Sequence, residues 1–590
     1  MAITDTRPVT EPDASSGAPP TVETVPAPAR GLAGLLGTGD HTRIGRLYLG
    51  SSLLFLVLAG VLGELVAIER VDSDGFAVFS DGSFLQAIGF HNVVGVFLFL
   101  LPLFVGLATV VVPLQVGART VAFPRAAAAA FWTHLLAGLL VVVAFTIDGG
   151  PYGARAAGVE IFVVAFAVLV VALLVAMICV VTTVLTLRAP GMTLDRVPLF
   201  AWSSLVAGVM WLLTLPVLLG GLVLLYLDLR YGQVFLGASD GLYPRMAWVL
   251  GQPQVYAFAV PALGVIGEIV PVMAGRRSRL HPIAMVAIAA FGAAGFGAYA
   301  QRAFDPDVVT EPLYVAFALL AMGALVVCFA VWGDALRRQD HGPQDDGPQD
   351  HGRQDDGRQD QGRQDQGRQA QGSDTGSARR PRLASPLLYA AAAALMLLVG
   401  VASGVLVGID PLELTDTTWA TAQVHYVLLG AAIAGLGGVQ YWAAKVLGRP
   451  LGESLGALAA AALLADTVAL AFPDLVSGAV GDDESAFVGI EALNAVVALG
   501  GALIVLGVLL FLVNLLGALR KGGAAGRDPW DGHTLEWLTA SPPVAGDAFD
   551  LPEITSATPA LDARTERDDH GDDHGDEDVE SSKEPEVSQP

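Results

Sequence analysis

Long apolar segments recur along most of this chain. A helix needs about 20 predominantly apolar residues to cross the hydrocarbon core of a bilayer. Segments of about that length or longer lie at 46–69, 87–113, 128–147, 158–187, 199–227, 246–274, 282–303, 312–336, 385–409, 419–444, 452–472 and 489–519. Because lipid offers no partners to backbone polar groups, such segments must form helices. The pattern predicts an all-α polytopic membrane protein with twelve transmembrane helices in one bundle.

Polar, low-complexity stretches divide the chain into segments. The insert at 339–384 repeats a short unit (QDHGP, QDDGP, QDHGR) that has no apolar face to bury, so we expect it to be disordered. The expected organisation is a disordered lead at 1–39, helices one to eight at 40–338, that insert, helices nine to twelve at 385–519, a segment at 520–549 and an acidic disordered tail at 550–590.

Charge places these segments relative to the membrane. Arginine and lysine residues of the short loops concentrate on the side of the chain termini, which predicts a cell-membrane protein with both termini in the cytoplasm. The net charge of -24 lies largely in the insert and the tail. An acidic chain of this kind is not expected to bind nucleic acid, and lipid is its expected surroundings.

Three of the ten histidines fall inside the predicted spans: His91, His134 and His425. An imidazole in a lipid-facing sequence needs a reason, because unsatisfied polar groups are costly there. Two histidines from separate helices can ligate one haem iron, and His91 with His425 is one such pairing; hydrogen-bonded packing histidines are the alternative. Gln423 lies two residues before His425, about 200° around a helix, and therefore faces another neighbourhood. His134 follows Trp132 and is interpreted as an interfacial residue.

Several ordered motifs resemble subunit I of the haem-copper oxidases, the cytochrome c oxidase family. The resemblance runs over nearly all of residues 40–549. It rests on DHTRIG with a following tyrosine at 40–48, VVPLQVGA at 111–118, AFPR at 122–125, WVLGQPQVY at 248–256, TDTTWATAQVHYVL at 415–428, DPW at 528–530, TLEW at 534–537 and SPP at 541–543. The resemblance implies a respiratory subunit that works with other oxidase subunits and receives electrons from a partner of the subunit II type.

The resemblance also assigns cofactor residues. In that family a histidine of helix two and the second histidine of a His-x-His on helix ten hold the low-spin haem, and His91 and His425 occupy those positions. We therefore expect one low-spin haem, with His91 and His425 as its iron ligands. Asp416 matches an aspartate of the family's outer magnesium site. The arginine pair that braces the haem propionates has no counterpart at 472–478, and Arg70 or Trp248 are substitutes.

The positions that hold the family's oxygen-reducing centre carry other residues in this chain. The high-spin haem ligand falls on Gln423, and the copper ligands fall on Gln252 and on the pair Gln301 and Arg302. Copper prefers imidazole or thiolate, and arginine is always cationic, so copper is expected to be absent.

The resemblance further implies that the family's proton routes are altered. The glutamate of one route is Gln254, which cannot titrate. The aspartate that usually precedes AFPR is Thr120, and span eight at 312–336 contains no lysine. Tyr256 remains, one turn beyond Gln252.

Other ionisable residues inside the spans are functional candidates by default, proton transfer included. These are Glu268, Asp466 and Glu491.

The leading interpretation is a divergent subunit I that keeps an electron-transferring haem without reducing oxygen. Three alternatives remain open: a haem-free structural or assembly subunit, a working terminal oxidase with a rebuilt centre, and an unrelated twelve-helix transporter. Whether the chain is an enzyme is not decided by its sequence.

Overall fold

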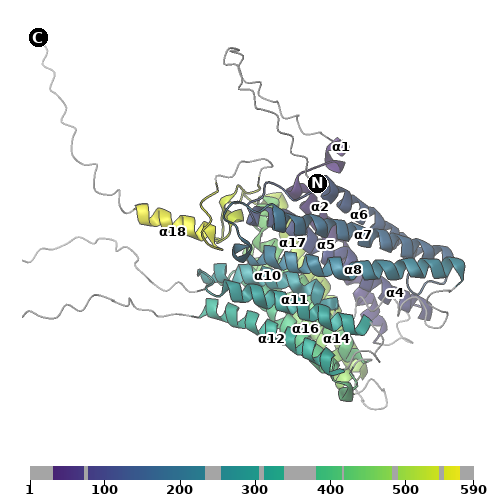
Figure 1. Cartoon of the computed structure of the whole chain (residues 1–590). Helices are drawn as coiled ribbons and strands as arrows, with labels where there is room; N and C mark the ends of the chain where they lie inside the picture. The colour runs from purple at the N-terminus through teal and green to yellow at the C-terminus, as the bar shows by residue number, and fades with distance from the viewer. Residues whose placement is uncertain are drawn as a thin grey trace, which may run out of the picture.

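The computed structural model describes residues 31–71, 78–232, 254–303, 311–337, 381–414, 417–480, 490–543 and 551–571. These residues form helices and no strand (Figure 1). The long helices are α2 (His41–Glu69), α4 (Asp81–Val93) continued by the π-helix η1 (Val94–Leu100) and α5 (Leu101–Gln115), α6 (Pro124–Thr146), α7 (Ala156–Thr186), α8 (Leu199–Tyr231), α10 (Gln254–Ala274), α11 (His281–Ala303), α12 (Glu311–Leu336), α13 (Ser385–Val407), α14 (Thr418–Tyr441), α16 (Glu453–Val480) and α17 (Ile490–Lys521).

Eleven helices among the described residues are long and apolar enough to cross a membrane. In α11 the side chains are described only as far as Phe296, so the apolar segment counted there is His281–Phe296. The predicted all-α membrane fold is therefore confirmed, whereas the number twelve is not. Local sequence explains several helix ends; for example, the Asp40 carboxylate accepts from the Thr42 backbone N–H at 2.9 Å and caps α2.

Burial separates central from peripheral helices. The apolar windows of Gly82–Gln115 and Val255–Ala274 are 94% and 100% buried, against 33% in α2 and in α17. The exposed residues of the peripheral helices are large and apolar, as lipid contact requires; Leu54, Leu136 and Val286 are examples. The central helices therefore present their side chains to each other, and any interior site lies between α4–α5, α10 and α14.

Small residues bring the central helices close together. A Cβ atom on Gly45 of α2 would lie 2.7 Å from the backbone oxygen of Gly106 in α5, and one on Gly106 would lie 3.0 Å from the Gly45 oxygen. Glycine at both positions therefore permits the close crossing of α2 and α5, a contact that membrane helices use in place of hydrophobic collapse.

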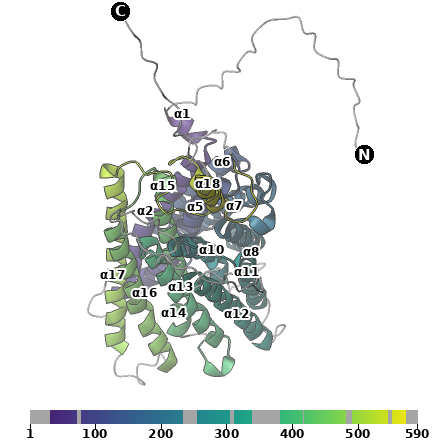
Figure 2. The ribbon, with the colours of Figure 1, turned by 90° about the vertical axis from the view of Figure 1, so that its left-hand side faces the viewer.

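Short elements gather at one end of the bundle, which we call the α18 end. They are α1 (Gly31–Leu36), α15 (Ala443–Leu447) and α18 (Pro559–Gly571) (Figure 2). The 3₁₀-helix η5 (Leu535–Leu538) packs against α18 there. Two further 3₁₀ turns are η2 (Leu194–Arg196) and η4 (Asp410–Leu412).

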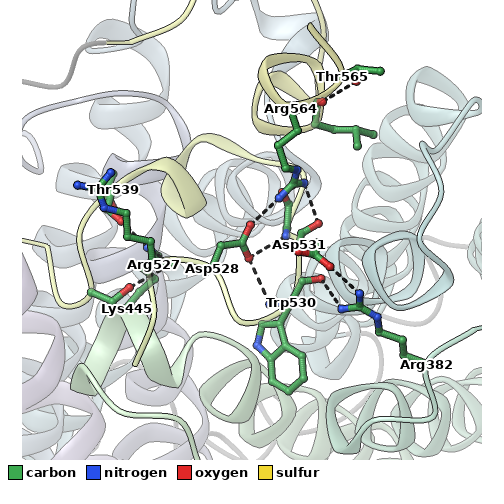
Figure 3. Close-up of polar contacts among 12 residues, drawn as sticks. Arg382, Lys445, Arg527, Asp528, Trp530, Asp531, Thr539, Arg564 and Thr565 are labelled. Carbon is green, nitrogen blue, oxygen red and sulfur yellow. Dashed lines mark hydrogen bonds and ion pairs between the residues drawn. The ribbon is translucent and has the colours of Figure 1, made fainter. Parts of the chain in front are cut away.

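The ranges 1–39 and 550–590, which we expected to be disordered, thus contain the helices α1 and α18. Arg564 explains the order at α18. Its guanidinium donates to the Asp528 carboxylate at 2.6 Å and to the backbone oxygens of Asp531 and Gly532 at 2.8 and 2.5 Å (Figure 3). Most of the 339–384 insert lies outside the described residues.

Candidate haem site and its neighbourhood

His91 on α4 packs against α2. Its Nδ1 lies 3.0 Å from the backbone oxygen of Ala59. A carbonyl oxygen can only accept, so Nδ1 donates and the lone pair of the ring lies on Nε2. A Cβ atom on Gly63, one turn after Ala59, would lie 2.7 Å from Cε1 of His91. Glycine at this position therefore lets the ring lie flat along α2, and the carbonyl fixes its tautomer as haem-ligating histidines require.

His425 on α14 is the second intramembrane imidazole. Its ring interacts electrostatically with His91, Arg70 and Asp474, so the two histidines share one neighbourhood. The Nδ1 atom of His425 is buried and has no hydrogen-bond partner in the structure. Both rings are only half-buried although they lie within the bundle. Each imidazole therefore has accessible surface that a planar ligand would cover.

An ion pair closes the end of this neighbourhood away from α18. Nη2 of Arg70 lies 2.7 Å from Oδ1 of Asp474, and Nη1 lies 3.3 Å from Oδ2. The side chain of Asn494 donates to the Arg70 backbone oxygen at 2.9 Å, and the hydroxyl of Thr418 donates to the Asp474 oxygen at 3.0 Å. This cluster ties α2, α14, α16 and α17 together and holds a cation near His425.

These features test whether the residues present fit a haem. Two imidazoles from separate helices share a neighbourhood, one has its tautomer fixed with Nε2 available, and the other has an orphaned nitrogen. A guanidinium is close by for the anionic edge of a macrocycle. The residues therefore fit a bis-histidine haem.

The other side of α14 differs. Gln423 is fully buried, and among the residues that the structure describes neither its amide oxygen nor its amide nitrogen has a partner with hydrogen-bond geometry. The Tyr256 hydroxyl, on α10, is equally buried and faces the amide of Gln423, although the contact does not meet hydrogen-bond geometry. The structure thus brings together two of the positions assigned to the oxygen-reducing centre, and they carry an amide and a phenol.

The structure does not describe the side chains at the remaining predicted positions. Gln252, Asp416 and Trp248 lie outside the described residues. Gln254 begins α10, and Gln301 and Arg302 lie near the end of α11, but their side chains are not described. Within the described part of the chain, no group of three or more His, Cys, Asp or Glu residues could hold a metal ion.

Sequence analysis missed a polar cluster at the α18 end. Glu536 of η5 is fully buried and accepts from the Gln115 amide at 3.2 Å and the Trp442 indole at 3.1 Å. Its carboxyl interacts with that of Glu268, one of the three predicted carboxyl candidates, and burial raises the pKa of Glu536. The TLEW motif was the available signal, but only the tertiary fold shows that this glutamate is buried.

Lys445 completes that cluster. Its ammonium donates to the backbone oxygens of Arg527 and Thr539 at 2.8 and 2.7 Å (Figure 3). It also lies over the Trp537 ring. Burial lowers the pKa of Lys445 to about 8. Of the other predicted carboxyls, Asp466 is buried with one unpartnered oxygen, and the Glu491 side chain is not described.

Comparison with known proteins assigns most of the chain, including nearly all of the bundle, to one family. The sequence model of the family described as cytochrome c and quinol oxidase polypeptide I matches residues 43–503. The chain belongs to that family. The resemblance drawn from the motifs is therefore confirmed, and this subunit I chain is a respiratory, haem-copper oxidase-type membrane protein.

Individual relatives agree over almost the full length. The chain is 30% identical to a putative cytochrome c oxidase subunit 1-beta of Streptomyces coelicolor, covering 90% of this chain and 91% of that protein. It is 26% identical to cytochrome c oxidase subunit 1 of Bacillus subtilis, covering 89% and 82%. A solved heme-copper terminal oxidase dimer aligns with a TM-score of 0.60 at 14% identity, covering 87% of this chain and 88% of that one, which shows the shared fold alone.

Proposed function

We propose that this subunit I chain carries one low-spin haem between His91 and His425 for electron transfer and lacks the high-spin haem and copper centre that reduces oxygen. The observation that carries the proposal is the contrast on α14. His425 shares its neighbourhood with His91 and Arg70, whereas Gln423 faces Tyr256 and has no well-formed hydrogen bond to any described residue.

The haem half of the proposal rests on donor chemistry. A haem held by two imidazoles supplies a one-electron ferric/ferrous couple. The chain's own contribution is to orient the ligands: Ala59 fixes the tautomer of His91, and the half-buried faces of both rings are left for a planar ligand to cover. Arg70, already paired with Asp474, is the cation that the propionates would share.

The second half rests on the residues at the positions of the lost centre. An amide at 423 is a poor iron ligand, and the glutamines at 252 and 301 with Arg302 are poor copper ligands. We therefore propose that copper is absent. Electrons then come from a partner subunit of the subunit II type, and the chain lies in the cell membrane with the α18 end in the cytoplasm.

The decisive experiment measures iron, copper and haem in the purified chain in detergent, together with its reduced-minus-oxidised spectrum. We expect about one haem per chain, no stoichiometric copper and no spectral shift with carbon monoxide, because a six-coordinate haem has no free site. His425→Ala should remove the haem, and Thr421→Ala, an exposed change on the same helix, should not.

Each alternative function predicts another result. A chain without any haem absorption is the haem-free structural or assembly subunit, and the proposal then fails. A carbon monoxide-shifted spectrum with bound copper indicates a working oxidase with a rebuilt centre. Haem content that survives His425→Ala makes His425 a packing residue.

A further inference from the structure

The helix that carries His91 contains a π-helix. Seven residues, Val94–Leu100, wind as η1 between α4 and α5, beginning three residues after His91. π-Helices are rare and occur mostly as local insertions at functional sites, because the wider turn disturbs the regular ladder of backbone hydrogen bonds. This one lies in one of the two most buried segments of the bundle, and six of its seven residues are buried.

Two side chains from neighbouring helices bind the carbonyl groups of this π-helix. Nε2 of His134, on α6, lies 3.0 Å from the Phe97 oxygen, and the Ser52 hydroxyl, on α2, donates to the Phe99 oxygen at 2.9 Å. His134 and Ser52 are both fully buried. The sequence-based interpretation of His134 as an interfacial residue is therefore wrong, because α6 turns this side chain into the bundle.

The proton on His134 follows from its partner. A carbonyl oxygen only accepts, so Nε2 carries the hydrogen, and the buried Nδ1 has no partner. A leucine would fill a similar volume without an orphaned nitrogen. Burying the imidazole is unfavourable, and its hydrogen bond to the Phe97 oxygen of η1 offsets this. Leucine could not make that bond.

The same face of α2 holds both ends of the segment. Ser52 and Ala59 are seven residues apart, close to two helical turns, so they lie on one face. Ser52 binds Phe99, and Ala59 binds the His91 ring. The stretch from His91 to Phe99 is thus fixed to α2 at both ends and to α6 near its middle.

We infer that His134 and Ser52 are positioning residues that hold the π-turn and thereby set the direction in which His91 presents Nε2. The inference rests on the proposed haem function. Because each residue advances a helix by about 100°, a π-turn that relaxes toward α-helical geometry rotates His91 relative to α5. His134 acts through the backbone and does not itself ligate the iron.

The test compares His134→Leu with His134→Gln in the full-length chain. Glutamine places an amide nitrogen near the position of Nε2 and can still donate to Phe97, whereas leucine cannot. Thr109→Val is the matched control, because Thr109 lies on the same long helix and bonds only within it, to the Val105 oxygen at 2.7 Å. Ser52→Ala is a second variant that perturbs the clamp from α2.

The readouts are the EPR g-values of the ferric haem, haem affinity, and hydrogen exchange of amides in 94–101. We expect His134→Leu to shift the g-values, weaken haem binding by about 10-fold or more, as loss of a group that orients a ligand does, and speed exchange several-fold. His134→Gln should restore most of each effect, Ser52→Ala should act in the same direction, and Thr109→Val should change none.

Two outcomes overturn the inference, and they are distinguishable. A haem-containing wild type whose g-values and affinity do not change in His134→Leu or Ser52→Ala refutes the positioning role alone. A glutamine variant as impaired as the leucine variant does the same. A wild-type chain that binds no haem refutes the proposed function together with this inference.

Discussion

The two sides of α14 bury polar groups in different ways. On one side, His425 lies with His91, whose ring is hydrogen-bonded to α2, and with the ion pair of Arg70 and Asp474. On the other side, Gln423 and Tyr256 are buried beside each other, and neither makes a well-formed hydrogen bond to the residues that the structure describes. A buried unsatisfied polar group destabilises the fold by about 1–3 kcal/mol. The polar groups on the His425 side are supported by hydrogen bonds and an ion pair, whereas those on the Gln423 side are destabilising. One helix thus separates a supported site from an unsupported one.

Ligand removal tests the comparison most strongly. His91→Ala should strongly reduce haem binding, because His91 and His425 would together hold the iron and one of these two imidazoles is lost. Gln423→Ala, two residues from the other ligand, should leave the haem absorption intact. The measurement is the haem-to-protein ratio after purification, and equal losses in both variants would contradict the asymmetry.

Stability gives the next test. Gln423→Leu replaces an unsatisfied buried amide by an apolar group of similar size and should stabilise the chain by about 1–3 kcal/mol. The expected result is a higher thermal unfolding temperature in detergent, with Tyr256→Phe acting in the same direction. A fall in that temperature would mean that Gln423 binds a ligand in the natural protein.

The α18 end differs from both sides of α14 because it lies near solvent. Burial, with the guanidinium groups of Arg564 and Arg277, lowers the pKa of His533 to about 4. The unfolded chain gains this proton near pH 6.5 and the folded chain only near pH 4, so stability rises with pH through this window. At pH 5 the folded segment should lose about 2 kcal/mol.

Limited proteolysis of the 551–571 segment at pH 7.5 and pH 5 measures that loss. The segment should be cleaved faster at the lower pH, and His533→Gln should remove most of the difference. A pH dependence that is unchanged by this substitution would assign the effect to the carboxyl groups of the cluster instead.

The smallest effect concerns charge beside the histidines. Asp474→Asn removes a negative charge near His425, which favours the reduced haem and should raise its midpoint potential by about 50 mV. Asp466→Asn, two turns away on the same helix, is the control and should cause a smaller shift. Redox titration of the α band measures both, and equal shifts would show that the potential does not depend on the Arg70–Asp474 pair.

The sequence predicts some of these features much better than others. Apolar periodicity and ordered motifs are sufficient for the fold class and the family, because both depend on local patterns that lipid and backbone chemistry impose. The haem ligands remain predictions, although the structure places His91 and His425 in one neighbourhood. The twelfth span stays a prediction, since the side chains of α11 are described only as far as Phe296.

Features that depend on tertiary contacts were not predictable. The side of α6 that bears His134 is decided by packing, and neighbouring Trp132 suggested the opposite orientation. The π-helix has no periodic signature, and Glu536 with Lys445 becomes buried only when the segment after α17 folds back over the α18 end. Ordering of α18 likewise depends on distant partners of Arg564.

The π-helix also determines how the direction of His91 depends on the number of residues in this helix. A wider turn accommodates an additional residue within an otherwise regular helix, so η1 works as a phase shift between the stretch that carries His91 and the stretch that packs against α2 and α8. Removing a single residue from Val94–Leu100 would return the helix to a regular pitch with His91 nearly in phase with Gly106, whereas winding all seven residues as α-helix would turn His91 by about 100° relative to Gly106. The length of this segment and its winding are therefore linked: His91 keeps its direction either with seven residues in a π-helix or with six in an α-helix.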